Sequence, residues 1–229
     1  MTTHLQREID KLKKKILYMG AEAEEILRIA VEALVSRNVK LAREAIESDE
    51  RLDHLEVEIE EDCLKILALH QPVATDLRYV IAVLKINNDL ERIGDLAVNI
   101  AERVTYLADR PSFHMPLDLK GMARLTQLMV KRSLDAIVNT DSKLAREVRA
   151  SDDEIDDINH GMYDVITEYI TRNPDQVEPA LHVLSATRHL ERIADQATNI
   201  AEDVIYLVEG DIVRHQHETY STNNVENDK

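Results

Sequence analysis

Apolar residues recur along this chain at the three- and four-residue spacing of an amphipathic α-helix. Between Ile93 and Leu107 they follow a 4-3-4-3 pattern, with Ala97, Ile100 and Val104 between them. At about 100° per residue this pattern places all five side chains on one side of a helix, as in the seam of a helix bundle. Similar amphipathic runs follow one another along the sequence, so the pattern predicts long helices that pack side by side.

Prolines and short polar residues indicate where these helices end. The five prolines fall in three places along the chain, and a proline disrupts the interior of a helix. Two further breaks lack proline but offer capping side chains, with Ser36 and Asn38 at the first and Asp141 at the second. These boundaries predict six helices, roughly over residues 3–36, 39–70, 75–108, 117–139, 142–172 and 176–208.

The six predicted helices are two copies of a three-helix unit. KLAREAIESDERLD at residues 40–53 aligns with KLAREVRASDDEID at residues 143–156, an offset of 103. ERIGDLAVNIAE at residues 91–102 aligns with ERIADQATNIAE at residues 191–202, an offset of 100, and nine of the twelve positions are identical. Self-similarity of this kind indicates a repeat architecture.

The repeat predicts an all-α fold of two tandem, pseudo-symmetric three-helix bundles. We expect residues 1–110 to form the first bundle, residues 117–210 the second, and residues 211–229 a flexible tail. The connections inside each unit are short, so neighbouring helices should run antiparallel.

Composition narrows the possible partners. Apolar residues make up 44% of the 229 positions but aromatic residues only 3%, so Leu, Ile, Val and Ala must fill the core. The net charge is −16, and only residues 11–15 contain a cluster of lysines. A protein that binds nucleic acid is expected to carry a basic stripe. The sequence therefore predicts no nucleic-acid partner.

The cysteine content, the N-terminal segment and the length of the apolar runs indicate where the protein is located. Cys63 is the only cysteine, which fits a reducing compartment. The N-terminal segment carries charges throughout and lacks the apolar stretch of a signal peptide. No run approaches the roughly 18 apolar residues of a membrane span. We expect a cytoplasmic protein without direct membrane insertion.

Acidic residues spaced four apart occur on matching helices of both repeats. On the second helix of each unit they flank the apolar stripe, and on the third helix they lie roughly opposite the apolar seam. These pairs are Asp49 and Asp53, Glu91 and Asp95, Asp152 and Asp156, and Glu191 and Asp195. Like charges four residues apart repel each other on a helix, whereas a cation held by oxygen ligands from two adjacent helices would cancel that repulsion. The spacing alone leaves a solvated charged face and a metal site both open.

Motifs of common enzyme classes are absent from the sequence. Di-iron carboxylate bundles need Glu-x-x-His, and none of the nine histidines has Glu three positions before it. The five glycines are far apart, so they form no phosphate-binding loop, and no G-x-S-x-G motif is present. We predict a protein that is not an enzyme. Two alternatives stay open, a metal-dependent enzyme on a helical bundle and a metal-independent scaffold whose acidic faces bind a basic partner.

At this point the residues match a known family. QPVATDLRYVIAVLKINNDLERIGDLAVNIAE at residues 71–102, and its echo HLERIADQATNIAEDVIYLVEG at residues 189–210, resemble the PhoU family of phosphate-specific transport accessory proteins. The resemblance covers about residues 5–215. It implies a cytoplasmic protein of two three-helix bundles, often a homodimer, that binds iron or zinc through its acidic motifs.

The resemblance also implies a regulatory function. Members of this family negatively regulate the phosphate regulon and phosphate uptake. They act as non-catalytic adaptors between the ATPase subunit of the phosphate ABC transporter and a sensor histidine kinase.

Carried onto the matching positions, the resemblance implies two metal sites. The first acidic site consists of Asp49, Asp53, Glu91 and Asp95. The second acidic site consists of Asp152, Asp156, Glu191 and Asp195. One turn further on, candidates to complete the coordination or to support it are Asn99, Glu102, Asn199 and Glu202. Arg92 and Arg192 stand beside the acids, where we expect them to compensate part of the negative charge.

Overall fold

The computed structural model of the chain describes residues 3–108, 110 and 117–213. In these residues the regular structure is helical throughout, with no strand. The elements in chain order are α1 (Thr3–Ser36), α2 (Val39–His70), α3 (Ala74–Ala108), α4 (Leu119–Asn139), α5 (Ser142–Arg149), α6 (Asp152–Arg172), the 3-10 turn η1 (Pro174–Gln176) and α7 (Val177–Glu209). The prediction of an all-α fold is confirmed.

Two of the predicted capping residues begin helices. The side chain of Asn38 accepts hydrogen bonds from the first amides of α2, and the side chain of Asp141 does the same for α5. Each cap satisfies backbone donors that have no partner inside the helix. Ser36 is instead the last residue of α1, and its hydroxyl donates a hydrogen bond to the carbonyl oxygen of Glu32.

The helix predicted over residues 142–172 is interrupted after its first eight residues. α5 ends at Arg149 and α6 begins at Asp152. Between them the amide of Ser151 donates to the carbonyl oxygen of Val148, three residues back, so the backbone tightens without reversing. Together α5 and α6 occupy the place that α2 holds in the first repeat.

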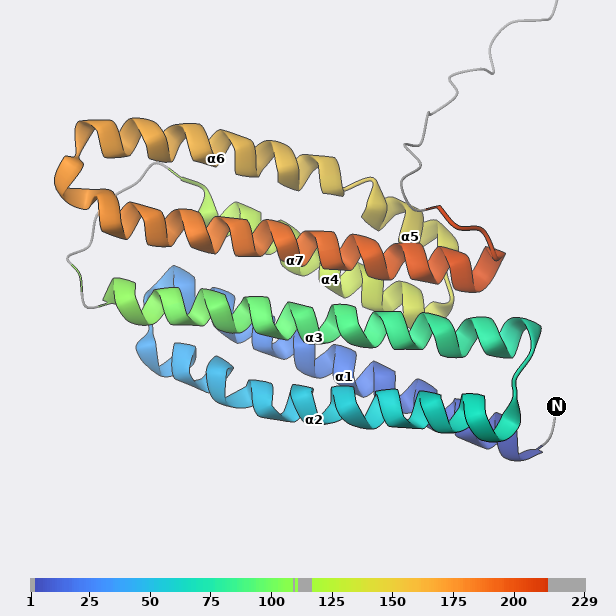
Figure 1. The fold of residues 1–229 in the computed structure, drawn as a ribbon. Helices are drawn as coiled ribbons and strands as arrows, with labels where there is room; N and C mark the ends of the chain where they lie inside the picture. Colours follow the sequence, from blue (N-terminus) through green and yellow to red (C-terminus); the bar gives the residue numbers. More distant parts are fainter. Residues whose placement is uncertain (1–2, 109, 111–116, 214–229) are drawn as a thin grey trace, which may run out of the picture.

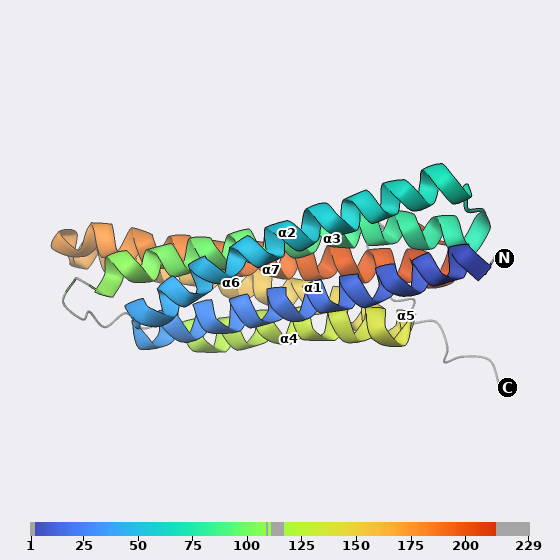
Figure 2. The same cartoon turned by 90° about the horizontal axis from the view of Figure 1, so that it is seen from below.

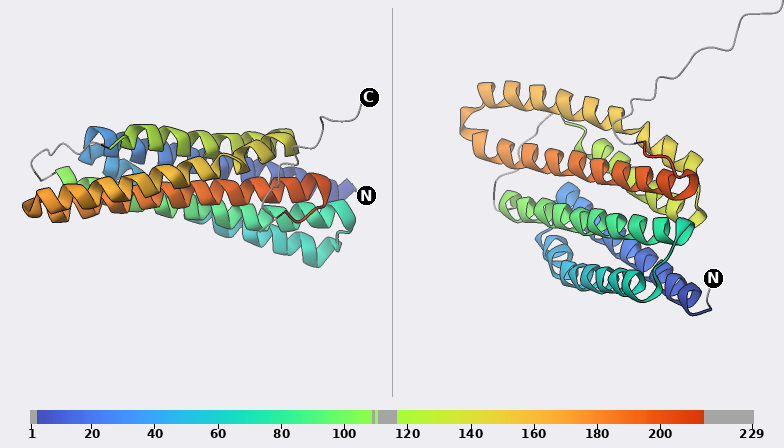
Figure 3. Two further views of the ribbon diagram at one scale, coloured as in Figure 1. Left: turned by 90° about the horizontal axis from the view of Figure 1, so that it is seen from above. Right: turned by 45° about the vertical axis from the view of Figure 1, so that its right-hand side comes forward.

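The helices form two layers (Figure 1). α6, α7, α3 and α2 lie in that order across the near layer, and α1 and α4 lie behind them. α1 and α4 run side by side, as the view from below shows (Figure 2), and α5 packs against α7 and α4. The turned views show the same arrangement (Figure 3). None of the helices in the described residues combines the length and hydropathy that a membrane crossing requires.

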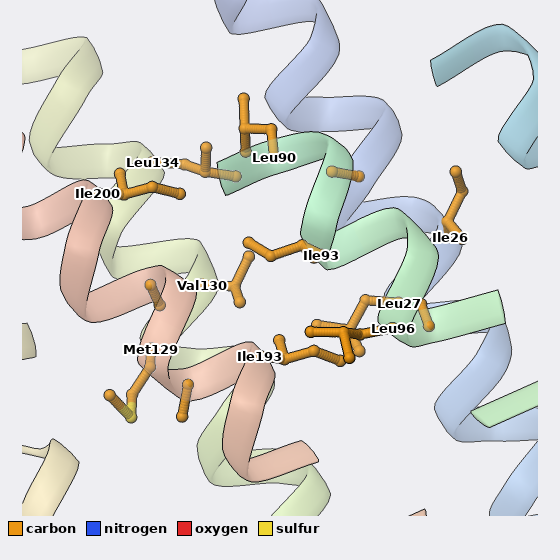
Figure 4. Close-up of a cluster of buried hydrophobic side chains, with 14 of the residues drawn as sticks. Ile26, Leu27, Leu90, Ile93, Leu96, Met129, Val130, Leu134, Ile193 and Ile200 are labelled. Carbon is orange, nitrogen blue, oxygen red and sulfur yellow. The ribbon is translucent and has the colours of Figure 1, made fainter. Parts of the chain in front are cut away.

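A single apolar core joins the two repeats. The core cluster contains side chains from α1, α2 and α3 as well as from α4, α5, α6 and α7. Ile93 and Leu96 of α3 point toward the same interior as Val130 of α4 and Ile193 of α7 (Figure 4). α3 and α7 therefore pack against each other at the centre of the molecule, with one repeat on each side.

The division into domains at residues 110 and 117 stays a prediction. Val213, in the segment predicted to be a tail, is buried in the core cluster. The rest of the predicted tail, residues 214–229, lies outside the described residues.

Candidate metal centres

α2 and α3 carry the four residues of the first acidic site, and their charges influence one another, but among the described residues only the second site has three carboxylate oxygens within 4.8 Å of one another. Asp49 is half-buried, and its Oδ1 is buried without a hydrogen-bond partner. Burial, and then the negative charges of Asp53 and Asp95, raise the pKa of Asp49 to about 6. Desolvation and like charges both disfavour an ionised carboxylate. Carboxylates of two helices are thus close enough to repel one another.

Glu91 adds a fourth carboxylate to the first acidic site, and the structure supplies a fifth. Burial raises the pKa of Glu91, followed by the charges of Asp95, Glu56 and the two aspartates of α2. Glu56 was not among the predicted site residues, although it stands three residues after Asp53 and hence on the same helix face. Its counterpart in the second repeat is Asn159, so a search for repeated acids could not find it.

A glycine allows α2 to approach α3 next to this site. A Cβ atom at Gly94 would lie 2.2 Å from Cδ2 of Leu52 and 2.9 Å from Oδ1 of Asp49. The missing side chain therefore leaves room for α2 to place both residues against α3. The corresponding residue of α7 is Ala194, which is fully buried.

The second acidic site lies between α6 and α7. Asp156, Glu191 and Asp195 each place one carboxylate oxygen within 4.8 Å of the others. Burial raises the pKa of Asp195 to about 6, with further increases from Glu191 and Asp156, whereas Arg192 lowers it. Arg192 also lowers the pKa of Glu191. Its predicted role in charge compensation is supported, whereas Arg92 is not among the groups that shift the pKa of Glu91.

Asp152, the fourth predicted residue of the second acidic site, is not among its three close carboxylates, and it has a hydrogen-bond donor that its counterpart lacks. Burial and then the charge of Asp195 raise the pKa of Asp152 to about 6. The hydroxyl of Thr198 donates to Oδ1 of Asp152 at 3.1 Å, which lowers that pKa in part. The residue of α3 that corresponds to Thr198 is Val98. Thr198 is thus a supporting residue that the sequence did not indicate.

The residues one turn further on are engaged differently in the two repeats. The Glu202 carboxylate accepts a hydrogen bond at 3.1 Å from Nε of Arg149, and both side chains are largely buried. A carboxylate held by an arginine in this way is a poor candidate to complete a coordination sphere. The amide of Asn99 donates to the carbonyl oxygen of Asp95 at 2.8 Å. Glu102 and Asn199 are exposed.

The second acidic site fits a hard cation through Asp156, Glu191 and Asp195, whereas the first offers the same type of ligand without three oxygens so close together. Each offers carboxylate oxygens from two helices and contains neither histidine nor cysteine. The raised pKa values, the close oxygens of the second site and the unpartnered Asp49 Oδ1 are features that a bound cation would relieve. Oxygen-only ligands suit iron better than zinc, because protein zinc sites draw mainly on nitrogen and sulfur ligands.

Comparison with known proteins identifies relatives over nearly the whole chain. The family model described as "PhoU domain" matches residues 16–104 and again residues 119–204. The chain is 40% identical over 213 residues to the phosphate-specific transport system accessory protein PhoU homolog of Aquifex aeolicus, covering 93% of this chain and 96% of that protein. It is 35% identical to the protein of the same name from Pseudomonas aeruginosa, covering 100% of this chain and 97% of that one.

Two crystal structures have the same fold. PhoU from Pseudomonas aeruginosa matches with a TM-score of 0.88 at 35% identity, over 90% of this chain and 99% of that chain. The phosphate transport system regulatory protein PhoU from Streptococcus pneumoniae matches with a TM-score of 0.81 at 30% identity, over 91% of this chain and 99% of that chain.

Proposed function

The chain belongs to the PhoU family, and from that membership we propose that it is an accessory protein of a phosphate-specific transport system. In this role it negatively regulates the phosphate regulon and phosphate uptake when phosphate is plentiful. The observation that carries the proposal is the match over almost the full length to relatives that bear this name.

We further propose that the protein acts by binding and catalyses no reaction. It would connect the ATPase subunit of the phosphate ABC transporter with a sensor histidine kinase, as a cytoplasmic protein and as a homodimer. Both acidic sites lack histidine and cysteine, so neither contains a cysteine–histidine pair for nucleophilic attack.

Metal ions are the third part of the proposal. The first acidic site would hold iron or zinc between α2 and α3, and the second acidic site would hold it between α6 and α7. A bound di- or trivalent cation supplies the positive charge that keeps the clustered carboxylates ionised. Because the carboxylates of each site come from two helices, a cation bound by them would link those helices. Metal binding would therefore make the α2–α3 contact and the α6–α7 contact more rigid.

A deletion strain tests the regulatory role. In a strain that lacks this gene and any paralogue, we expect periplasmic alkaline phosphatase activity to stay high in medium rich in phosphate, because the status of the transporter no longer reaches the kinase. Expression of the wild-type chain from a plasmid should restore repression. Normal repression in the clean deletion strain would contradict the proposed function.

A further inference from the structure

α3 and α7 run antiparallel and meet along a seam in the near layer (Figure 1). Toward the first end of this α3–α7 seam, Nζ of Lys85 lies 3.1 Å from Oδ1 of Asp203. Toward the second end, the rings of Tyr106 and His182 stack with their centroids 3.7 Å apart. Both contacts follow one register, because Tyr106 stands 21 residues after Lys85 and His182 stands 21 residues before Asp203. Matching positions of the two ends can therefore be compared.

The two ends of the seam carry different charges because the two repeats differ there. Asp203 of α7 corresponds to Arg103 of α3, and Lys85 of α3 corresponds to Ser185 of α7. At the first end the side chain of Asp203 is buried and pairs with Lys85. At the second end the same register places Arg103 opposite Ser185, which carries no charge. The ion pair of the first end is thus replaced by an arginine opposite a hydroxyl group.

Three polar atoms at the second end of the seam are buried without a hydrogen-bond partner. They are Nε of Arg103, Nδ1 of His182 and Nδ1 of His189. Among the lysines and arginines of the described residues that are not exposed, only Arg103 has a nitrogen of this kind. Buried polar atoms in folded proteins nearly always have a partner, so three of them along one stretch of the seam point to a ligand that supplies it.

Positive charge surrounds His189. Burial lowers the pKa of His189, and the charges of three arginines lower it further, namely Arg103, Arg192 and Arg188. No carboxylate of the described part of the chain is among the groups that shift this pKa. Arg188 and Arg192 also lower the pKa of Glu191 in the second acidic site, so part of their charge is compensated there. For Arg103 the described residues contain no carboxylate within ion-pair distance.

The acid that acts on His182 already has a partner. Burial and then the charge of Arg103 lower the pKa of His182, whereas Glu178 raises it in part. The Glu178 carboxylate lies 3.8 Å from the guanidinium group of Arg110, which lies 4.9 Å from the centre of the Tyr106 ring. The charges of Glu178 and Arg110 offset each other, so the uncompensated charge at this end of the seam is that of Arg103.

We infer that the second end of the α3–α7 seam binds a tetrahedral oxyanion of the phosphate type between Arg103, His182 and His189. The guanidinium group supplies the positive charge and a donor at Nε, and the two imidazole rings supply donors from α7. Nε2 of His189 lies 3.2 Å from the hydroxyl oxygen of Ser185. When this hydroxyl donates to Nε2, the proton of the neutral ring stands on Nδ1, which is the buried atom without a partner. Ser185 is thereby a positioning residue.

These donors fit a phosphate group better than other occupants. A water molecule satisfies hydrogen bonds but leaves the charge of Arg103 uncompensated. A carboxylate presents two oxygens in one plane, whereas the donors here come from two helices. Phosphate presents several oxygens in different directions and forms charge-assisted hydrogen bonds with guanidinium groups. A nucleic acid would require a basic stripe that continues along the surface.

Nuclear magnetic resonance provides the first test. The full-length chain is titrated with inorganic phosphate in EDTA, so that metal at the acidic sites binds none of it, and chloride keeps the ionic strength constant. We expect the Nε–H resonance of Arg103 and the ring resonances of His182 to move along a saturable curve, and those of the exposed Arg124 and His54 to stay in place. No movement at Arg103, or the same movement with chloride alone, would overturn the inference.

Calorimetric titration of variants provides the second test. Arg103→Gln should weaken the binding of phosphate at least about tenfold, because a hydrogen bond to a charged group is lost. The matched control Arg124→Gln removes the same charge from an exposed position of α4 and should bind as the wild type does. Ser185→Ala should weaken binding about fivefold, and it serves as the test variant if the melting curve of Arg103→Gln shows an unfolded chain. Wild-type affinity in the folded variants would overturn the inference.

Phosphoserine identifies the source of the phosphate group. Tighter binding of inorganic phosphate would assign the site to free phosphate, and tighter binding of phosphoserine would assign it to a phosphorylated side chain. Failure of both to bind would overturn the inference. The inference goes beyond the proposed function and does not rest on it, because every measurement uses the purified chain. A derepressed deletion strain whose protein binds no phosphate would refute the site alone, and a normally repressed strain whose protein binds phosphate would refute the regulatory role alone.

Discussion

Replacing Asp49 by Asn should stabilise the metal-free protein at neutral pH. Burial and neighbouring acids raise the pKa of Asp49 from its usual 3.8 to about 6 in the folded chain. A carboxyl group with a raised folded pKa contributes stability that is fully present below the unfolded pKa and is lost as pH rises through the folded pKa. At pH 7.5 the ionised Asp49 therefore opposes folding, and Asn removes that charge with little change of shape.

The size of the effect follows from the pKa. A rise of about two corresponds to roughly 3 kcal/mol between the two protonation states. Asp49 is only half-buried, so solvent screening reduces this to about 1 kcal/mol. For a chain of this size that free energy corresponds to a rise of about 2–4 °C in the melting temperature.

Calorimetry in a chelator at two pH values tests the reasoning. At pH 7.5 Asp49→Asn should melt above the wild type, and at pH 5.0 the difference should fall to about half, because pH 5.0 lies between the usual pKa of 3.8 in the unfolded chain and the folded pKa of about 6. Glu50→Gln, at an exposed position of the same helix, should change neither melting temperature. With metal bound the sign should reverse, since Asn is a poorer ligand. An unchanged melting temperature at pH 7.5, or an equal rise at both pH values, would refute the argument.

Three further substitutions probe the candidate sites. Changing Glu91 to Gln and Asp95 to Asn should empty the first acidic site and leave the second filled. Elemental analysis after loading with iron should then find about half the wild-type iron content. Loss of iron from both sites would contradict independent binding. Thr198→Val removes the donor to the second acidic site and should weaken metal binding there roughly fivefold in chelator competition, as expected for one hydrogen bond, with the first site unchanged. Gly94→Ala forces a methyl group against Leu52 and should lower the free energy of unfolding, measured in urea, by about 1–3 kcal/mol. An unchanged urea midpoint of unfolding would show that α2 can move away from α3 without loss of stability.

Helix boundaries and the acidic pairs could be predicted because both depend on neighbours in the sequence. A capping side chain such as Asn38 or Asp141 bonds to amides two or three residues away, so its effect is local. The break after Arg149 is harder to see, because α2 carries the same Ser-Asp pair and continues through it. In the second repeat three consecutive acids, Asp152 to Glu154, begin the new helix, where its dipole favours negative charge.

The differences between the two acidic sites could not be predicted from the repeat. Comparing the copies draws attention to residues that both share, so Glu56 and Thr198, each present in one copy only, escape notice. The pairing of Arg149 with Glu202 depends on which side chain of α5 faces α7, and sequence spacing does not determine that contact. Each of these residues acts across a helix–helix contact, beyond the reach of periodicity along one helix.

The shared core has a consequence for how such a chain changes over generations. Because Ile93 and Ile193 fill one interior, neither copy can be lost, exchanged or moved to another gene without exposing the apolar surface of the other. Substitutions along α3 and α7 must therefore suit both copies at once. α2 and α6 lie at opposite edges of the near layer, away from the contact between α3 and α7. Residues at the contact between α3 and α7 must therefore change together, whereas residues of α2 and α6 can differ between the two copies. Glu56 in one copy and Asn159 in the other are an example.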